Sequence, residues 1–437
     1  MSKYVKLENL IQSVSKTHMF NKDKLVFLNT SDVLEGKILI NNYMPISEMK
    51  GQAKKSIQNG DILYSEIRPK NRRYAFVKNI DNVEDYVVST KLMVLRNQSD
   101  KLDTNYLYHF LTSEGAVNYL QNRAENRIGS FPQITFEIIQ SLNIYLPDLP
   151  IQQKIAAVLS ALDDKIEVNN KINAELEAMA KTLYDYWFVQ FEFPFDFAQG
   201  KPDAEGKPYK SSGGRMVYNS TLKREIPEGW EVSVFNNWIE KTKTGDWGKE
   251  EIEGNYTARV YCVRGADING LNGKGEVKAP QRYILNNNLS KKLEENDFII
   301  EISGGSPTQS TARIALLTKE SFDRFDTDVV CSNFCKAVTL KNSLYAFNFQ
   351  QEWHRLYDAG VFFGYEGKTS GIKNFLFDSF MESYHIVKPE ENIVKQYQLI
   401  AKDLEKKRQI NLKQNQELAQ LRDWLLPMLM NGQVTVE

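Results

Sequence analysis

The sequence has few of the residues that build metal sites or disulfide frameworks. Its 437 residues include only three cysteines and four scattered histidines. These numbers exclude a disulfide framework and disfavour a zinc centre, so we expect no bound metal and a reducing, cytoplasmic location. No hydrophobic run approaches the roughly 20 residues of a membrane helix, and the start MSKYVKLENL lacks the apolar core of a secretory signal.

Motifs of the common nucleotide-dependent enzymes are also missing. The chain has no GxxxxGK[ST] loop, no GxGxxG after a strand, and no Asn/Asp-Pro-Pro-aromatic tetrapeptide of amino-methyltransferases. Asp203, Glu205 and Lys207 superficially match a metal-dependent nuclease, but they fall in one predicted loop and could not converge on Mg²⁺. We therefore predict a non-catalytic chain.

Charge is nearly balanced, with 55 basic and 56 acidic side chains. Taken whole, this balance argues weakly against a nucleic-acid partner. Residues 1–150 carry net +3 and residues 230–389 net −2, so any binding to nucleic acid must be local. Hydrophobic residues make up 42% of the chain, enough to fold it, and its length predicts at least two domains.

The chain contains an internal repeat. The segment that begins PDLPIQQKIAAVLSALDDKI at Pro147 is similar to the segment that begins at Pro389. A constant offset between the two segments aligns asparagine with asparagine and leucine with leucine. Each copy predicts a long helix, over 151–187 and 390–426, with apolar residues spaced by three and four and asparagines in mid-seam. The seam positions are Leu162, Ile166, Asn169, Asn173 and Leu176, then Leu404, Asn411, Asn415 and Leu418. We favour a coiled coil over the alternative, in which each helix packs on its own domain with its asparagines solvated.

Short β-prone runs before each helix repeat more weakly, which predicts two mixed α/β globules on a shared scaffold. A Gly-, Pro- and Ser-rich stretch between the halves predicts an extended linker. Trp187, Phe188 and Trp424 are expected to pack at the helix ends. The predicted divisions are a first domain at 1–147, a central helix at 148–191, a linker at 192–229, a second domain at 230–388 and a distal helix at 389–430.

Two loops in each half carry cations, amides and hydroxyls that could bind an anionic polymer. Lysine and arginine neutralise phosphates, whereas arginine, asparagine and glutamine also read base edges. The candidates are Arg68, Lys70, Asn71, Arg72, Arg73, Arg127, Ser130 and Gln133 in the first half, and Thr308, Gln309, Arg313, Lys368, Thr369, Lys373 and Asn374 in the second. Solvated surface is the alternative for each residue. Their recurrence at equivalent places in both repeats keeps DNA contact open.

Several strings resemble the specificity subunit of type I restriction–modification enzymes, over essentially the whole chain. They are IQQKIA at 151–156, LDDKI at 162–166, YDYWF at 184–188, GKPYKSSGG at 206–214 and IPEGW at 226–230. The distal helix departs from the family pattern at its start, where Ile393-Val394-Lys395-Gln396 replaces a glutamine-rich segment. This departure leaves the expected fold unchanged.

The resemblance implies two target recognition domains joined by two antiparallel coiled-coil helices. Each domain would read one half of a bipartite double-stranded DNA site, and the helices would set the spacing and dock two methyltransferase subunits, with a restriction subunit added for cleavage. S-adenosylmethionine, ATP and Mg²⁺ would belong to those partners, which form an adenine-specific methyltransferase and ATP-dependent endonuclease. The alternative from another class is a coiled-coil protein–protein adaptor that does not bind DNA.

Overall fold

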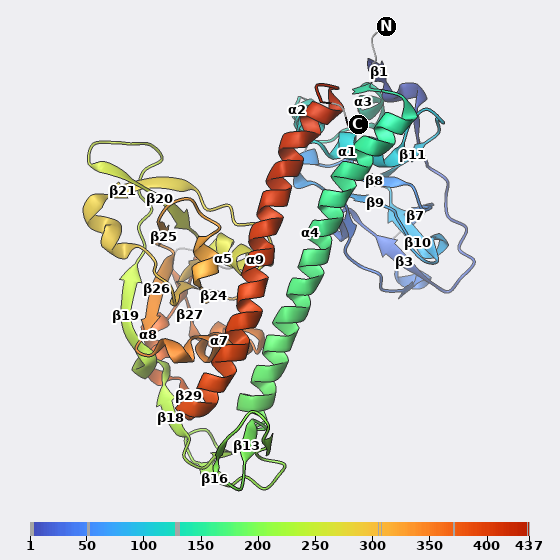
Figure 1. Ribbon diagram of the computed structural model, residues 1–437. Helices are drawn as coiled ribbons and strands as arrows, with labels where there is room; N and C mark the ends of the chain where they lie inside the picture. Colours follow the sequence, from blue (N-terminus) through green and yellow to red (C-terminus); the bar gives the residue numbers. More distant parts are fainter. Residues whose placement is uncertain are drawn as a thin grey trace. The chain divides into compact units, whose positions relative to one another are not determined.

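The computed structural model describes residues 4–49, 53–126, 132–304, 306, 308–369, 372–434 and 436. The chain divides into two compact units, Met1–Ile166 with Glu417–Glu437 (unit 1) and Glu167–Gln416 (unit 2). Each unit contains one mixed α/β domain, and two long helices join the two domains (Figure 1). Among the described residues, no helix has the length and apolar character needed to cross a membrane.

The described part of unit 1 contains two four-stranded sheets and two strand pairs. Their orders are β2-β11-β8-β9, β6-β3-β10-β7, β1-β12 and β4 (Val33–Leu34) with β5 (Lys37–Ile38). The strands are β1 (Tyr4–Lys6), β2 (Ile11–Ser13), β3 (Lys24–Leu28), β6 (Met44–Pro45), β7 (Ala53–Ser56), β8 (Ile62–Ser65), β9 (Tyr74–Phe76), β10 (Tyr86–Ser89), β11 (Leu92–Asn97) and β12 (Asn143–Tyr145). Helices α1 (Thr104–Thr112), α2 (Glu114–Glu125) and α3 (Phe136–Gln140) pack on this core.

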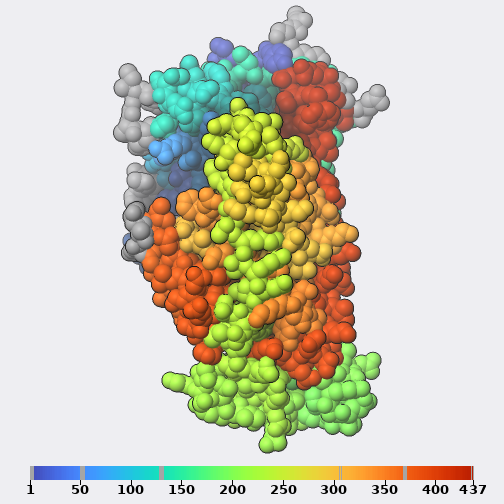
Figure 2. All heavy atoms as spheres, turned by 90° about the vertical axis from the view of Figure 1, so that its left-hand side faces the viewer, coloured from blue at the N-terminus to red at the C-terminus, as the bar shows by residue number. Residues whose placement is uncertain are grey.

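Unit 2 repeats this plan with additions. Its main sheet has the order β19-β26-β22-β24, beside β21-β20-β25, β18-β29 and β23-β28-β27. The strands are β18 (Glu231–Val234), β19 (Ile239–Thr244), β20 (Tyr256–Val263), β21 (Gln281–Leu285), β22 (Asp297–Glu301), β23 (Ser303–Gly304), β24 (Ile314–Leu316), β25 (Val329–Cys331), β26 (Cys335–Leu340), β27 (Glu366–Thr369), β28 (Ile372–Phe375) and β29 (His385–Lys388). The helices are α5 (Ile268–Leu271), α6 (Lys319–Phe322), α7 (Ala346–Asp358) and α8 (Phe377–Ser383). Figure 2 shows one face of this unit, where yellow-green and yellow residues of its first part lie beside orange residues of its second.

The predicted repeat is present in the strand order as well as in the helices. In both units a four-stranded antiparallel sheet accompanies a parallel pair, β3 with β10 in unit 1 and β20 with β25 in unit 2. The central strands β8 and β22 are buried along their whole length. Strands covered on both faces need short apolar runs, which the sequence supplies as ILY in β8 and FII in β22.

A buried aspartate begins each central strand. Asp61 is fully buried, accepts a hydrogen bond from the backbone of Gln58 at 2.9 Å and forms an ion pair with Arg96 at 2.6 Å. Asp297 occupies the same place, accepts from the backbone of Glu294 at 2.8 Å and pairs with Lys243 at 2.9 Å. A buried carboxylate is stable only when it is paired and hydrogen-bonded. The scaffold has therefore kept the acid and changed the partner cation between the repeats.

The two long helices are α4 (Leu149–Tyr184) and α9 (Glu391–Met430), so both predicted helices are confirmed. In unit 2 they run antiparallel, because Asn169 contacts Asn415 whereas the later Asn173 contacts the earlier Asn411, both at 2.9 Å. Asn169 is 1% and Asn173 6% exposed, and their partners on α9 are half-buried, so the asparagines of α4 lie inside the seam. In unit 1, α4 and α9 are joined by an ion pair at 2.8 Å between Asp163 and Arg422.

The apolar residues of the predicted seam are less buried than Asn169 and Asn173 of α4. Leu162, Ile166, Leu176, Leu404 and Leu418 are all half-buried. The predicted packing at the helix ends is correct for Trp187 and Phe188, which are buried, and wrong for Trp424, which is 63% exposed. Helical spacing alone could not show which face of α9 has a neighbour.

The predicted extended linker over 192–229 differs from the structure. This segment folds into β13 (Pro194–Asp196), β14 (Lys201–Pro202), β15 (Lys207–Pro208), β16 (Met216–Asn219) and β17 (Arg224–Pro227). Phe193 stacks on Tyr209 with ring centroids 4.6 Å apart and on Trp230 at 5.3 Å. Aromatic packing replaces the missing aliphatic residues, which is why a scarcity of aliphatics misled the prediction.

The buried asparagine pair predicts a measurable local stability. Replacing Asn173 by alanine should lower the opening free energy of α4 by about 1–2 kcal/mol, because the amide of Asn411 loses its acceptor. Hydrogen–deuterium exchange of the α4 amides within unit 2 measures this opening. Removing both asparagines should cost less than the sum of the two single changes. Ile172→Ala, on the exposed side of α4, is the control, and equal losses at Ile172 and Asn173 would contradict the seam assignment.

Burial of His109 predicts a pH-dependent stability of unit 1. His109 of α1 lies 3.1 Å from Ser160 Oγ on α4, and burial lowers its pKa to about 4, with smaller opposing effects from Asp163 and Arg422. As the pH falls, the unfolded chain binds this proton before the folded chain does. The stability that the neutral, buried imidazole contributes is therefore complete above pH ~6.5 and is lost as the pH falls toward 4. We expect the melting temperature to fall between pH 7.5 and pH 5, and to fall less in His109→Gln. An identical fall in both proteins would remove His109 as the cause.

Candidate nucleic-acid interface

The two predicted loops of the first domain lie side by side. The loop after β8 pairs with the segment before α3 through a bridge between Ile67 and Gln133. The backbone N–H of Arg68 donates to the carbonyl of Pro132 at 3.2 Å, and that of Ile134 donates to Glu66 at 2.8 Å. Segments more than 60 residues apart therefore form one surface.

The first loop is held in a tight, partly left-handed conformation. Arg68 and Arg72 have φ values of 44° and 52° on either side of a short 3₁₀ turn at Pro69–Asn71. The backbone N–H of Lys70 donates to the buried Gln121 of α2 at 3.1 Å. Left-handed backbone at non-glycine residues persists only where the surroundings hold it, and such positions cluster at binding sites.

Only some of the predicted cations of this loop point into solvent. Arg68, Lys70 and Asn71 are exposed. Arg72 forms ion pairs with Glu114 and, at 3.9 Å, with Glu35. Arg73 donates to the carbonyls of Ser31 and Val33 at 2.9 and 3.3 Å, so it braces the loop. Gln133 is half-buried, and Arg127 and Ser130 lie outside the described residues.

The second domain brings its two predicted loops together as a small sheet. Strand β23, directly after β22, pairs with β28, so that Ser303 faces Asn374 and Gly304 faces Lys373. The hydroxyl of Ser303 donates to Asn374 Oδ1 at 2.6 Å. The arrangement matches that of the first domain, with a strand pair in place of a single bridge.

Glu366 ties these loops to each other. Its carboxylate accepts hydrogen bonds at 2.8 Å from the Ser310 hydroxyl and the Thr311 backbone, and pairs with Lys373 at 2.9 Å. Burial raises the pKa of Glu366, but the Thr311 N–H and the Lys373 ammonium outweigh it, and the pKa lies below its ordinary value. The carboxylate therefore stays charged and holds both loops.

Arg313, a predicted DNA contact, is engaged by a carboxylate within the domain. Its guanidinium makes two hydrogen bonds to Glu301, at 2.8 and 2.6 Å, and the two side chains are 13% and 2% exposed. Lys373 forms an ion pair with Glu366 and is likewise turned away from solvent. Thr308 is exposed and Gln309 half-buried, whereas the side chains of Lys368 and Thr369 lie outside the described ones. The buried cations thus support the loops instead of facing a ligand.

A third segment, which no sequence motif singled out, lies against each pair of loops. In the first domain, the carbonyl of Lys91 accepts from the N–H of Glu66 at 3.1 Å. In the second, the carbonyl of Phe334 accepts from Ile302 at 2.9 Å. Both residues occupy the turn that enters the strand next to the central one, β11 or β26. Because this contact is made by backbone atoms, no side-chain pattern identifies it in advance.

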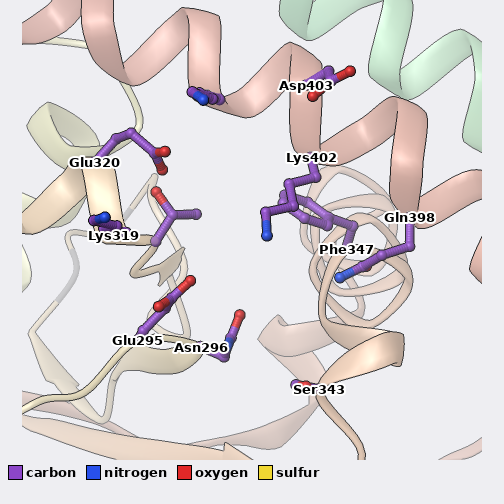
Figure 3. Close-up of a pocket in the computed structure, with 11 residues that line it drawn as sticks. Glu295, Asn296, Lys319, Glu320, Ser343, Phe347, Gln398, Lys402 and Asp403 are labelled. Carbon is purple, nitrogen blue, oxygen red and sulfur yellow. The ribbon is translucent and has the colours of Figure 1, made fainter.

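A separate cavity of about 350 Å³ lies in unit 2, where residues of α6 and α7 face α9. Figure 3 shows Lys402 of α9 reaching into it opposite Glu320 and Glu295. Its charged lining mixes lysines with carboxylates, so it presents no field of one sign to a ligand. No cluster of potential metal ligands occurs among the residues that the structure describes.

Comparison with known proteins agrees with this architecture. A family model described as type I restriction modification DNA specificity domain matches residues 2–178. The type I restriction enzyme HindI specificity subunit of Haemophilus influenzae is 34% identical over 274 residues, 62% of this chain and 59% of that protein. The MjaIX specificity subunit of Methanocaldococcus jannaschii is 26% identical over 80% of this chain and 76% of that protein. The match to the Haemophilus protein thus spans less than two thirds of its length.

A solved structure shares the fold. The type I restriction–modification S subunit from M. genitalium aligns over 98% of this chain and 95% of its own, with a TM-score of 0.51 and 14% identity. At that identity the likeness concerns the fold alone. The specificity domain at residues 2–178 and the matching relatives show that the chain is similar to type I restriction–modification specificity subunits.

Proposed function

We propose that the chain recognises a bipartite double-stranded DNA sequence as the specificity subunit of a type I restriction–modification complex, each domain reading one half. The observation that carries this proposal is the recurrence of two adjoining loops at the same place in both repeats, with different side chains in each. A shared scaffold with divergent loops is what two readers of different half-sites need.

The two domains differ in how they would hold DNA. The first presents exposed cations at Arg68 and Lys70, which suit phosphates. The second presents hydroxyl and amide groups at Thr308 and Gln309, which suit phosphate oxygens and base edges. We expect the first half-site to contribute most of the salt-dependent affinity.

The catalytic steps would belong to partner subunits. A holoenzyme of this type would combine two adenine methyltransferase subunits with a restriction subunit, and S-adenosylmethionine, ATP and Mg²⁺ would bind there. The methyltransferase subunits would dock on the long helices, where α9 exposes Leu399 and Ile410 among charged side chains.

The helices would also set the distance between half-sites. Helices α4 and α9, of 36 and 40 residues, span roughly 54–60 Å at ~1.5 Å per residue, between one and two turns of DNA at ~34–36 Å per turn. The paired asparagines favour one register of α4 against α9, so the spacing would be fixed rather than variable.

The exposed cations predict a change in salt dependence. Replacing Arg68 and Lys70 together by alanine should weaken DNA binding by the assembled complex and make the slope of log affinity against log salt shallower by about two. Removing two phosphate contacts releases two fewer counterions. Lys24→Ala, an exposed cation on the other sheet of the domain, is the matched control. An unchanged slope in the double variant would exclude this loop from the interface.

Helix length predicts the spacing of the recognised sequence. Co-expression with the methyltransferase subunit and genome-wide mapping of methylated adenines should give a split motif. Inserting seven residues in both α4 and α9 should lengthen the unread spacer by about three base pairs, since seven helical residues add ~10 Å. Both half-sites should stay the same. Altered half-sites would contradict the spacing role, and absence of any methylated motif would favour the protein–protein adaptor.

A further inference from the structure

The turn between β25 and β26 presents an aromatic side chain to solvent beside the loops of the second domain. Asn333 and Phe334 are exposed at its tip, and Phe334 is 55% exposed. The carbonyl of Phe334 accepts hydrogen bonds from Ile302 at 2.9 Å and from Ser303 at 3.2 Å. The aromatic residue is thus attached to the backbone from which the proposed recognition loop begins.

The turn that carries Phe334 is rigid. Ser332 is buried, its N–H donates to Val263 at 2.8 Å, and its carbonyl accepts from Cys335 at 2.9 Å. Gly245 packs so closely that a Cβ there would meet the Ser332 carbonyl. A phenylalanine held outward by such packing loses little conformational freedom on contact with a ligand.

The equivalent turn of the first domain carries a cation. Lys91 makes the same backbone contact, to Glu66 at 3.1 Å, and its ammonium lies 3.4 Å from the Glu66 carboxylate. The repeat has therefore exchanged lysine for phenylalanine at one structural position. In the second domain, the nearby cations Arg313 and Lys373 are already engaged by carboxylates. Contacts that do not depend on charge must then supply more of its affinity and specificity.

We propose that Asn333 and Phe334 form a third DNA-contacting element of the second domain, with Phe334 making an apolar contact to a base of the second half-site. This inference rests on the proposed function. Aromatic side chains contact thymine methyl groups and stack on unstacked bases, and an asparagine amide reads the edge of adenine. The exposed turn offers both kinds of side chain next to Ser303 and Asn374.

Phe334→Ala should weaken binding of the methyltransferase-assembled complex to its cognate DNA about tenfold. It should leave the salt slope unchanged, because no phosphate contact is lost. The loss should be far smaller on DNA with a scrambled second half-site. Replacing each thymine of that half-site by uracil distinguishes a methyl contact from stacking. If Phe334 contacts a thymine methyl group, the wild-type complex should bind the uracil DNA about as weakly as Phe334→Ala binds the thymine DNA. If Phe334 stacks on a base, the wild-type complex should bind both DNAs equally.

Tyr218→Ala is the matched control, since Tyr218 is an exposed aromatic residue on β16. It should bind cognate DNA like the wild type. Phe334→Lys, which copies the first domain, should restore affinity only at low salt and not the preference for the second half-site. Cognate binding by Phe334→Ala within twofold of wild type would overturn the inference. If the wild-type complex itself lacks sequence preference, the proposed function fails instead.

Discussion

The asparagine pairs between α4 and α9, each with one buried member, are the interaction on which the rest of the molecule depends. Asn169 with Asn415 and Asn173 with Asn411 are two copies of one contact, related by the internal repeat. A slip in register would leave amides unpaired inside the seam, at a cost of about 1–3 kcal/mol for each buried group. Half-buried leucines alone would tolerate such a slip. The polar seam therefore sacrifices some stability to define one alignment of two helices.

The near-balance of charge follows from how the domains use their ions. Asp61 and Asp297 each form an ion pair with a cation inside the sheets. Near the loops, Arg313 and Lys373 form ion pairs with carboxylates. These pairs hold backbone in place and contribute little field outside. Net charge thus reports the scaffold more than the proposed interface, which explains why a chain of net −1 is compatible with a DNA ligand.

The sequence predicted the features that are periodic or repeated. The two helices and the internal repeat follow from apolar spacing and self-similarity. The sequence predicted poorly whether a side chain is exposed, because residues distant in the chain decide this. Whether Arg313 faces solvent depends on Glu301 across an antiparallel sheet, and the exposure of Trp424 depends on which side of α9 lacks a neighbour. The spacing of residue types along the sequence shows neither of these contacts.

Separation of scaffold and tip explains how one fold could serve two different half-sites. The positions that anchor the loops, such as Glu301, Glu366 and Gln121, bind backbone or buried side chains and leave the tips unconstrained. Exchange of lysine for phenylalanine between Lys91 and Phe334 leaves the backbone hydrogen bond intact, since a carbonyl makes it. Side chains at such tips can therefore change without refolding the domain. Specificity would then evolve by substitution at the tips, while the paired acids and asparagines preserve the geometry that positions them.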